Sequence, residues 1–458
     1  MKTTLLTLVL ISATWRGLAG NDAIEDYAAH EWGTFTSVQG ADGVLLEWNP
    51  LETTKLPGFV YDWTKPGLDR RPAGGLNSGL KSRFLTLQRM ETPVIYFYSD
   101  AERTVDVTVR FPQGLITEWY PQAQEIGPSA FPPNKLATAL DGLVRQAGLS
   151  PRITFESLFG KKGIPDSRIH WSQLRVLPVK EHADVAAAIP NDTSGSHYFA
   201  ARETDAAFVR VASRDKAHPA EHEKFLFYRG VANFKTPLNI TVNEAVDTDL
   251  ILRNTGTEEL RHVFVLHVRR GQGKFTYQER LTPNMHVNVE LVPGGCSLLS
   301  QDELVTRVSQ RMREALVQEG LYPQEAGAMV KTWRESWFEE EGVRVLYILP
   351  RAWTDETLPM TLEPAPRKIV RVMVGRAEIL PPATQWQLIR QIVRYADGVE
   401  EERRQAAANV RQLHLGRFLK PAFQLVLGAN PNREFSLAAG NLLDTASKPI
   451  DAKSLAAK

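Results

Sequence analysis

Six short runs of β-branched and aromatic residues between Phe225 and Val292 constrain the fold of this chain more than any other feature of its sequence. Short polar connections separate them, among them the segment from Asn254 to Gly256. Short strands at this spacing are typical of a β-sandwich or a similar antiparallel layer. The predicted strands are Phe225–Tyr228, Leu238–Val242, Leu250–Leu252, Val263–Val268, Phe275–Gln278 and Val287–Leu291.

Further strands are predicted on both sides of this region. Val94–Tyr98 is a compact run of β-branched and aromatic residues, and Val105–Phe111 alternates between apolar and polar residues. Val343–Leu349 and Ile369–Val374 show strand patterns later in the chain. Between residues 21 and 89, aromatic residues and turn formers predict one strand followed by a long loop.

Ser300 marks the change from strands to helices. Its side chain can cap a helix while Glu303 reaches back to the backbone, which is the capping box. A second helix is predicted to begin at Pro323 and to end at Gly342, because proline suits the first turn and glycine the C-terminus. Helices are also expected from residue 384 to about residue 427.

These patterns together predict an α+β fold. A β-rich antiparallel, sandwich-like layer is followed by a helical and mixed C-terminal region that packs on it. We expect the β-rich domain over residues 20–299, with one helix at Asn134–Leu149, and the C-terminal region over residues 300–458. The connection at Ser300 is short, so the two parts are expected to be in contact.

The N-terminus has the order of features found in an export signal. Lys2 supplies a positive start, Leu5–Ala13 is apolar, and small residues surround Ala19, after which a signal peptidase could cut. The apolar run is too short to span a bilayer, which takes about 20 residues. We therefore expect residues 1–19 to be a signal peptide and the protein to be soluble and periplasmic or secreted; a buried N-terminal strand or helix is the alternative.

Charge and composition exclude several classes of protein. The 54 basic and 53 acidic residues leave a formal charge of +1, so no generic electrostatic grip on nucleic acid is indicated. No later stretch is long and apolar enough to span a membrane. The single cysteine excludes an intrachain disulfide, and stability must come from a hydrophobic core, for which ten tryptophans and 43% hydrophobic residues are ample.

One passage matches a metal-site signature. His218, Glu221 and His222 fit H-x-x-E-H, in which two histidines one helical turn apart bind zinc and the glutamate activates water. The residues from Lys224 onward already show a strand pattern, which leaves too little helix to hold a metal. We expect no metal and no cofactor. Ser194 and Ser196 lie beside His197 but in a turn composition, so a serine nucleophile is not expected either.

His30 and Glu31 invite a general-base or metal interpretation. Adjacent side chains in a regular strand point to opposite faces, so the two should not cooperate unless Gly33 permits a bulge. We expect Trp32 and Phe35 to pack in the core. Trp333 and Trp337, one helical turn apart, are interpreted as a core stripe in preference to a platform for sugar rings.

Several charged residues stand beside aromatic passages, and they form the candidate ligand site or structural clamp. Arg229 shares a strand face with Phe225 and Phe227, so it needs an acidic partner, for which Glu118 and Glu203 are candidates. The predicted cluster comprises His30, Glu31, Glu118, Arg202, Glu203, Arg229 and Arg334.

Four passages resemble a family of uncharacterised exported proteins from environmental bacteria. They are the segments His30–Thr36 (HEWGTFT), Arg89–Val94 (RMETPV), Phe225–Gly230 (FLFYRG) and Thr332–Phe338 (TWRESWF). The resemblance implies export but no activity, cofactor or catalytic residue.

The sequence favours a noncatalytic binding or scaffold protein, because no catalytic set stands out and β-layer architectures are common in such modules. The ligand is unknown, and a glycan is among those considered. The alternative is an extracytoplasmic hydrolase that acts on a glycan or ester substrate. A pocket with convergent carboxylates or a histidine and acid of perturbed pKa would favour the enzyme.

Overall fold

The structure is a computed structural model of the chain. It describes residues 26–51, 56–62, 84–127, 153–154, 156, 167–180, 183–213, 219–243, 249–291, 298–430 and 432–448. The expected signal peptide, the helix expected at Asn134–Leu149 and His218 lie outside the described residues.

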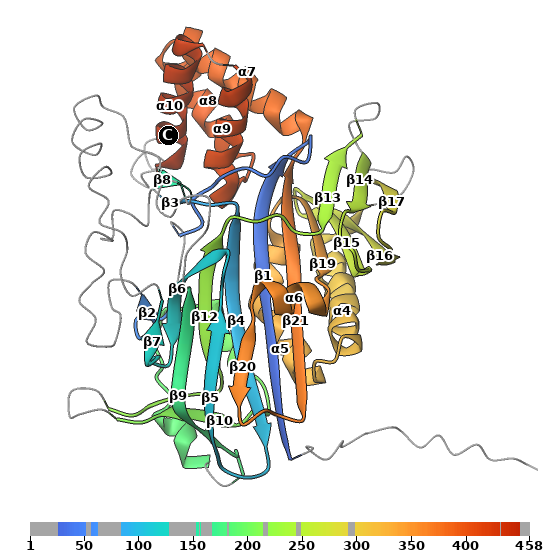
Figure 1. Ribbon diagram of the computed structural model, residues 1–458. Coiled ribbons are helices and arrows are strands. Elements are labelled where there is room, and N and C mark those ends of the chain that lie inside the picture. Colours follow the sequence, from blue (N-terminus) through green and yellow to red (C-terminus); the bar gives the residue numbers. More distant parts are fainter. Residues whose placement is uncertain are drawn as a thin grey trace, which may run out of the picture.

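A ten-stranded sheet forms the centre of the molecule (Figure 1). Its strands come from both the N-terminal and the C-terminal parts of the chain, so the sheet continues across Ser300. In spatial order they are β18 (Leu299–Ser300), β16 (Gln272–Leu281), β15 (Leu260–Arg269), β19 (Gly342–Ile348), β21 (Lys368–Leu380), β1 (Tyr27–Gly40), β4 (Gln88–Ser99), β12 (Leu226–Ala232), β6 (Gly114–Tyr120) and β2 (Tyr61–Asp62).

β1 and β21 are the long central strands of this sheet. They run parallel, with Ala28 opposite Lys368 and Gly40 opposite Leu380. On its other edge β1 pairs with β4 in the antiparallel sense, and the register shifts by one residue between Trp32 and Thr34. All 14 residues of β1 are buried. A strand buried on both faces needs cover from two further layers.

Two smaller sheets cover one face. The first contains β11 (Glu221–Glu223), β10 (Phe208–Val211), β9 (Arg168–Leu177), β5 (Arg103–Arg110) and β20 (Met360–Glu363), with β7 (Glu125–Ile126) also paired to β9. The second contains β13 (Leu238–Val242), β14 (Asp249–Asn254) and β17 (His286–Glu290), and β3 (Phe84–Leu85) pairs separately with β8 (Ile153–Thr154).

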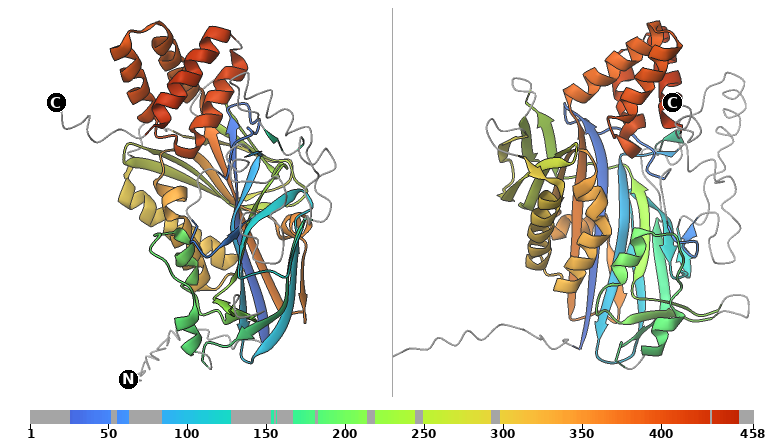
Figure 2. Two further views of the ribbon diagram at one scale, coloured as in Figure 1. Left: turned by 90° about the vertical axis from the view of Figure 1, so that its left-hand side faces the viewer. Right: turned by 180° about the vertical axis from the view of Figure 1, so that it is seen from behind.

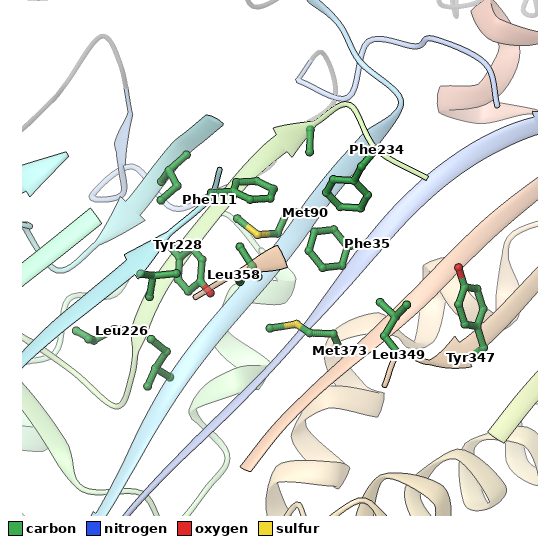
Figure 3. Packing of buried hydrophobic residues seen from close by; sticks show 14 of the residues in the cluster. Phe35, Met90, Phe111, Leu226, Tyr228, Phe234, Tyr347, Leu349, Leu358 and Met373 are labelled. Atoms are coloured by element: carbon green, nitrogen blue, oxygen red, sulfur yellow. The ribbon is translucent and has the colours of Figure 1, made fainter. Parts of the chain in front are cut away.

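The core between these layers is continuous and aromatic. Phe35 of β1 packs against Phe111 and Phe234, with ring centroids 6.4 and 5.3 Å apart, and Met90 and Met373 fill the space beside it (Figure 3). Alternating valines of β5 complete the core on the side of the six-stranded sheet. The structure thus has the sandwich-like layer that the strand patterns predict.

Helices cover the opposite face of the large sheet. They are α4 (Gln301–Gln318), α5 (Pro323–Arg334) and the short η2 (His197–Arg202), and α5 continues into the π-helical turn η3 (Glu335–Glu339). The capping box of Ser300 and Glu303 is present. Trp333 and Trp337 stack at 6.2 Å and are buried, so the prediction of a core stripe is confirmed.

Four helices pack beyond one end of the sheet (Figure 2). They enclose a separate core with Val38 of β1, Leu380 of β21 and Trp48. The helices are α7 (Pro382–Asp397), α8 (Glu400–Arg411), α9 (Leu419–Ala429) and α10 (Arg433–Ser447), with the turn η4 (Gly416–Phe418) before α9. A further helix, α6 (Arg351–Thr357), precedes β20.

The predicted α+β class is confirmed, with two local differences. Gly342 begins β19 and does not end the second helix, because that helix turns into η3 and stops before residue 340. α10 lies beyond residue 427, where the expected helices were to end. Within the described part of the chain, no helix has the length and apolar character needed to cross a membrane.

Candidate functional site: a buried arginine belt

Charged side chains cross the helix-covered face of the ten-stranded sheet near the C-terminal helices. Side chains alternate along a strand, so Arg376 and Glu378 follow Val374 on this face. In register, Thr36 of β1 stands between Arg376 of β21 and Arg89 of β4. We define the arginine belt as Arg89, Glu91, Glu118, Arg229, Glu340, Arg344, Arg376, Glu378 and Arg417.

At one end of the belt, two carboxylates hold three guanidinium groups. Nε of Arg229 donates to Oε2 of Glu118 at 2.8 Å, and Nη1 of Arg417 donates to Oε1 of Glu91 at 2.9 Å. Nε of Arg89 lies 3.7 Å from Oε2 of Glu91, which is an ion pair without a hydrogen bond. Since Arg417 belongs to η4, this end ties the C-terminal helices to β4.

At the other end, two arginines share two carboxylates. Nη2 of Arg376 donates to Glu340 at 2.8 Å and to Glu378 at 3.1 Å, and Nε of Arg344 donates to Glu378 at 3.1 Å. Nη1 of Arg344 also donates to the backbone carbonyl of Trp337 at 3.2 Å. The turn η3 is thus fastened over this end of the belt.

Several donors of the belt are left without a partner. Five guanidinium groups face four carboxylates in the described residues, and a buried donor without a partner costs about 1–3 kcal/mol, more if it is charged. The buried atoms without a hydrogen bond are Nε of Arg89, Nη2 of Arg229, Nε and Nη1 of Arg376, and Nε and Nη2 of Arg417.

Burial perturbs the ionisation of groups in and near the belt. It lowers the pKa of Arg89 to about 9, and the charges of Arg229 and Arg417 add to this while Glu91 opposes it. Burial also lowers the pKa of His197, whose ring stacks 5.1 Å from Trp333, to about 4. The belt therefore holds its positive charge at a cost that an added negative charge would relieve.

The pKa of Glu91 is lowered as well, and in a carboxyl group this predicts acid sensitivity. Burial alone would raise the pKa of Glu91, but the charges of Arg417 and Arg89 outweigh it and hold that pKa well below its usual range. A lowered folded-state pKa stabilises the fold above the unfolded value of about 4.3, and this is lost as pH falls further.

We expect Glu91→Gln to be less stable than the parent protein at pH 7 by on the order of 2–4 kcal/mol, with the difference shrinking between about pH 5 and pH 2. Urea unfolding at each pH measures it. Burial raises the pKa of Glu223, so this residue changes the stability with pH in the opposite sense. Because Glu223 is present in both proteins, its contribution cancels in the comparison. A difference that stays constant over this range would contradict the assignment.

Of the seven residues of the cluster predicted from the sequence, the structure brings one pair into direct contact. Glu118 and Arg229 pair within the belt, so Glu118 and not Glu203 is the acidic partner of Arg229. The other five pair with residues outside the predicted set. Lys331 binds Glu203 at 2.5 Å and Glu339 binds Arg334 at 2.7 Å, both at exposed positions. Glu203 and Arg334 nevertheless line one surface pocket.

His30 and Glu31 point to opposite faces, as strand alternation predicts. Nδ1 of His30 lies 2.7 Å from Oε2 of Glu325 under α5. On the sandwich side, Glu31 accepts a hydrogen bond from Arg371 at 2.6 Å and another from Tyr228. Both are buried, each within its own pair.

Arg202 occupies a third location. It donates to both carboxylate oxygens of Glu223, at 2.9 and 2.6 Å, and lies over the ring of Phe199 at 4.9 Å. Tyr198 donates to the same carboxylate at 2.9 Å. These contacts fasten η2 to β11.

The metal-site signature does not lie on a helix. Glu221 and His222 belong to strand β11, and Glu221 accepts a hydrogen bond from Tyr61. No group of three or more His, Cys, Asp or Glu side chains in the described ranges is arranged to hold a metal ion.

Sequence reasoning missed most of the belt, although a signal was present. Arg376 and Glu378, like Arg371, interrupt the apolar run of β21, as buried charges do. The four passages singled out in the sequence also meet here. The first passage contributes Thr36, the second Arg89 and Glu91, the third Arg229, and the fourth the backbone carbonyl of Trp337.

Comparisons with known proteins add little. No protein-family model and no curated protein matches the chain. Among solved structures, the yeast delta-COP-I mu-homology domain complexed with a Dsl1 WxWxV peptide is similar at 7% sequence identity and a TM-score of 0.23, over 78% of this chain and 97% of that chain. A TM-score this low carries no argument about fold or function.

Proposed function

We propose that this chain is a noncatalytic binding protein, acting in the periplasm or outside the cell, whose ligand carries an oxyanion that binds at the arginine belt. One observation carries the proposal: six buried guanidinium nitrogen atoms of four belt arginines have no hydrogen-bond partner in the described residues. An oxyanion supplies the acceptors that these donors need.

The chemistry of arginine specifies the class of ligand. Its planar guanidinium group is suited to carboxylate, sulfate and phosphate oxygens, which it binds with short charge-assisted hydrogen bonds. A neutral ligand would leave the excess positive charge of the belt unbalanced. The lowered pKa of Arg89 supports the same class, because a bound anion favours the charged form.

Two side chains of the belt meet solvent. The side chain of Glu340 is 38% exposed and that of Arg417 is 12% exposed, whereas the other belt side chains are almost fully buried. A ligand would therefore enter beside η3 and η4, and the Arg417 side chain would move toward the ligand.

The ionisation of the belt supports binding over hydrolysis. A general acid needs a raised pKa, but Arg376 and Arg417 outweigh burial and lower the pKa of Glu340, as Arg417 and Arg89 do for Glu91. Both carboxylates are held ionised and paired. The hydrolase considered from the sequence gains no support from this arrangement.

Thermal melts of the intact chain with sulfate, phosphate or acetate, at constant ionic strength made up with chloride, test the proposal. At least one oxyanion is expected to raise the melting temperature in proportion to the logarithm of its concentration, as ligand binding to the folded state requires. Arg417→Gln is expected to weaken the affinity for this oxyanion at least tenfold, and Arg417→Lys to restore part of the affinity.

Arg334→Gln is the matched control, because Arg334 is an exposed arginine paired with Glu339 outside the belt. It should respond like the parent protein. Equal responses to every anion and to chloride, or an unchanged response in Arg417→Gln, would show that the belt is a structural clamp and not a ligand site.

A further inference from the structure

A separate cavity of about 460 Å³ lies between the end of the large sheet and the C-terminal helices. Its sheet wall is formed by the end of β15, the start of β19 and the end of β21, and its helix wall by α7 and α8. The volume is within the range of small-molecule sites, about 300–1,000 Å³. The cavity reaches the edge of the belt at Glu378 and Phe418.

Four carboxamide side chains line the helix wall. Gln387 and Gln391 project from α7, and Asn409 and Gln412 from α8 and its C-terminal cap. Each carboxamide both donates and accepts hydrogen bonds, as a hydroxyl group does. A surface of this kind matches a ligand with many hydroxyl groups.

One hydrogen bond between the helices and one within α8 orient two of these amides. Nδ2 of Asn409 donates to Oε1 of Gln391 at 3.0 Å, and Nε2 of Gln405 donates to Oδ1 of Asn409 at 2.9 Å. Oε1 of Gln391 is then occupied, and its NH₂ group can donate to a ligand. Fixing the amides before binding reduces the entropy that binding would cost.

The charges around the cavity balance. Glu341 and Glu378 contribute carboxylates, and Arg269 and Arg270 contribute guanidinium groups on the sheet side. Glu378 is neutralised further by Arg344 and Arg376. An anion would meet the carboxylates and a cation the arginines, so the lining favours an uncharged ligand.

Gly342 sets the floor of the cavity. Its φ is +134°, and a Cβ there would lie 2.4 Å from Oε1 of Glu378. Glycine therefore lets the backbone of β19 pass directly beneath the Glu378 carboxylate.

We propose that this cavity is a second binding site, for an uncharged, hydroxyl-rich small molecule of the size of a mono- or disaccharide. The site shares Glu378 with the belt, but it lies on the side of the C-terminal helices. Its recognition rests on the carboxamides of α7 and α8 and not on the arginines.

Calorimetric titration of the intact chain with glucose, galactose, mannose, N-acetylglucosamine, maltose and cellobiose tests the site. At least one sugar is expected to bind, and Gln391→Leu to weaken it about tenfold, the effect of losing one amide hydrogen bond. Gln412→Leu, at an exposed position, serves as a second variant should Gln391→Leu unfold. Gln310→Leu, an exposed amide on α4, should bind like the parent.

The response of the melting temperature to sulfate separates the two proposals. Gln391→Leu should lose sugar binding and keep whatever response to oxyanions the parent shows. Failure of all six sugars to bind, or equal sugar affinity in Gln391→Leu and the parent, would overturn the second site without touching the first.

Discussion

Replacing Glu31 with leucine is expected to lower the free energy of unfolding by about 3–5 kcal/mol, the usual cost of stranding one member of a buried ion pair. Glu31 is fully buried and accepts hydrogen bonds from Arg371 and Tyr228. Without Glu31, the remaining carboxylate partner of Arg371 is Asp355, whose side chain is 46% exposed. That contact cannot compensate a guanidinium group that is otherwise buried.

Denaturant unfolding of three variants, each compared with the parent protein, measures this loss of stability. Glu31→Leu should show the full loss, and the double variant Glu31→Leu/Arg371→Met should recover most of it, because replacing both partners removes the stranded charge. Glu203→Leu, which breaks a contact between two exposed side chains, should change little. A Glu31→Leu variant as stable as the parent would mean that the pair contributes nothing to the stability of the fold.

The segment from residue 300 to residue 458, expressed alone, is expected not to fold. β19 and β21 lie in the interior of the ten-stranded sheet, where β19 pairs with β15 and β21 pairs with β1. Without residues 20–299, both strands lose a neighbour and the buried rings of Trp333 and Trp337 lose the sheet face against which they pack.

Near-ultraviolet circular dichroism and thermal melting of the fragment decide the matter. We expect no cooperative transition and no native aromatic signal, and both should return when residues 20–299 are co-expressed with it. A cooperative melt of the isolated fragment with native-like dichroism would show that its core is self-sufficient.

Local patterns predicted the strands well, because alternation and β-branched content act within a few residues. The predicted run Leu238–Val242 matches β13 in both bounds, and the other five runs of that region each overlap a strand. The distribution of these strands between sheets was not predictable. β12, β15 and β16 join the large sheet while β13, β14 and β17 form their own, because partner choice depends on segments far away in the sequence.

The candidate site was only partly predictable for the same reason. Arg229 could be recognised as a buried cation from its place in an apolar strand, and one of its two candidate partners was correct. Arg417 lies in the short turn η4, and no local pattern connects it with Glu91, 326 residues away. Charged pairs formed across the fold leave no periodic signal in either segment.

The parallel pairing of β1 with β21 also governs the order in which the molecule can assemble. Residues paired across it, such as Glu31 and Arg371, are 340 positions apart, so β4 and β12 are synthesised long before β21. Until then one edge of a fully buried strand has no partner, and such an edge is a template for aggregation. Contacts of this sequence separation also slow folding. The nascent chain therefore depends on protection of β1 until residues 368–380 have been made.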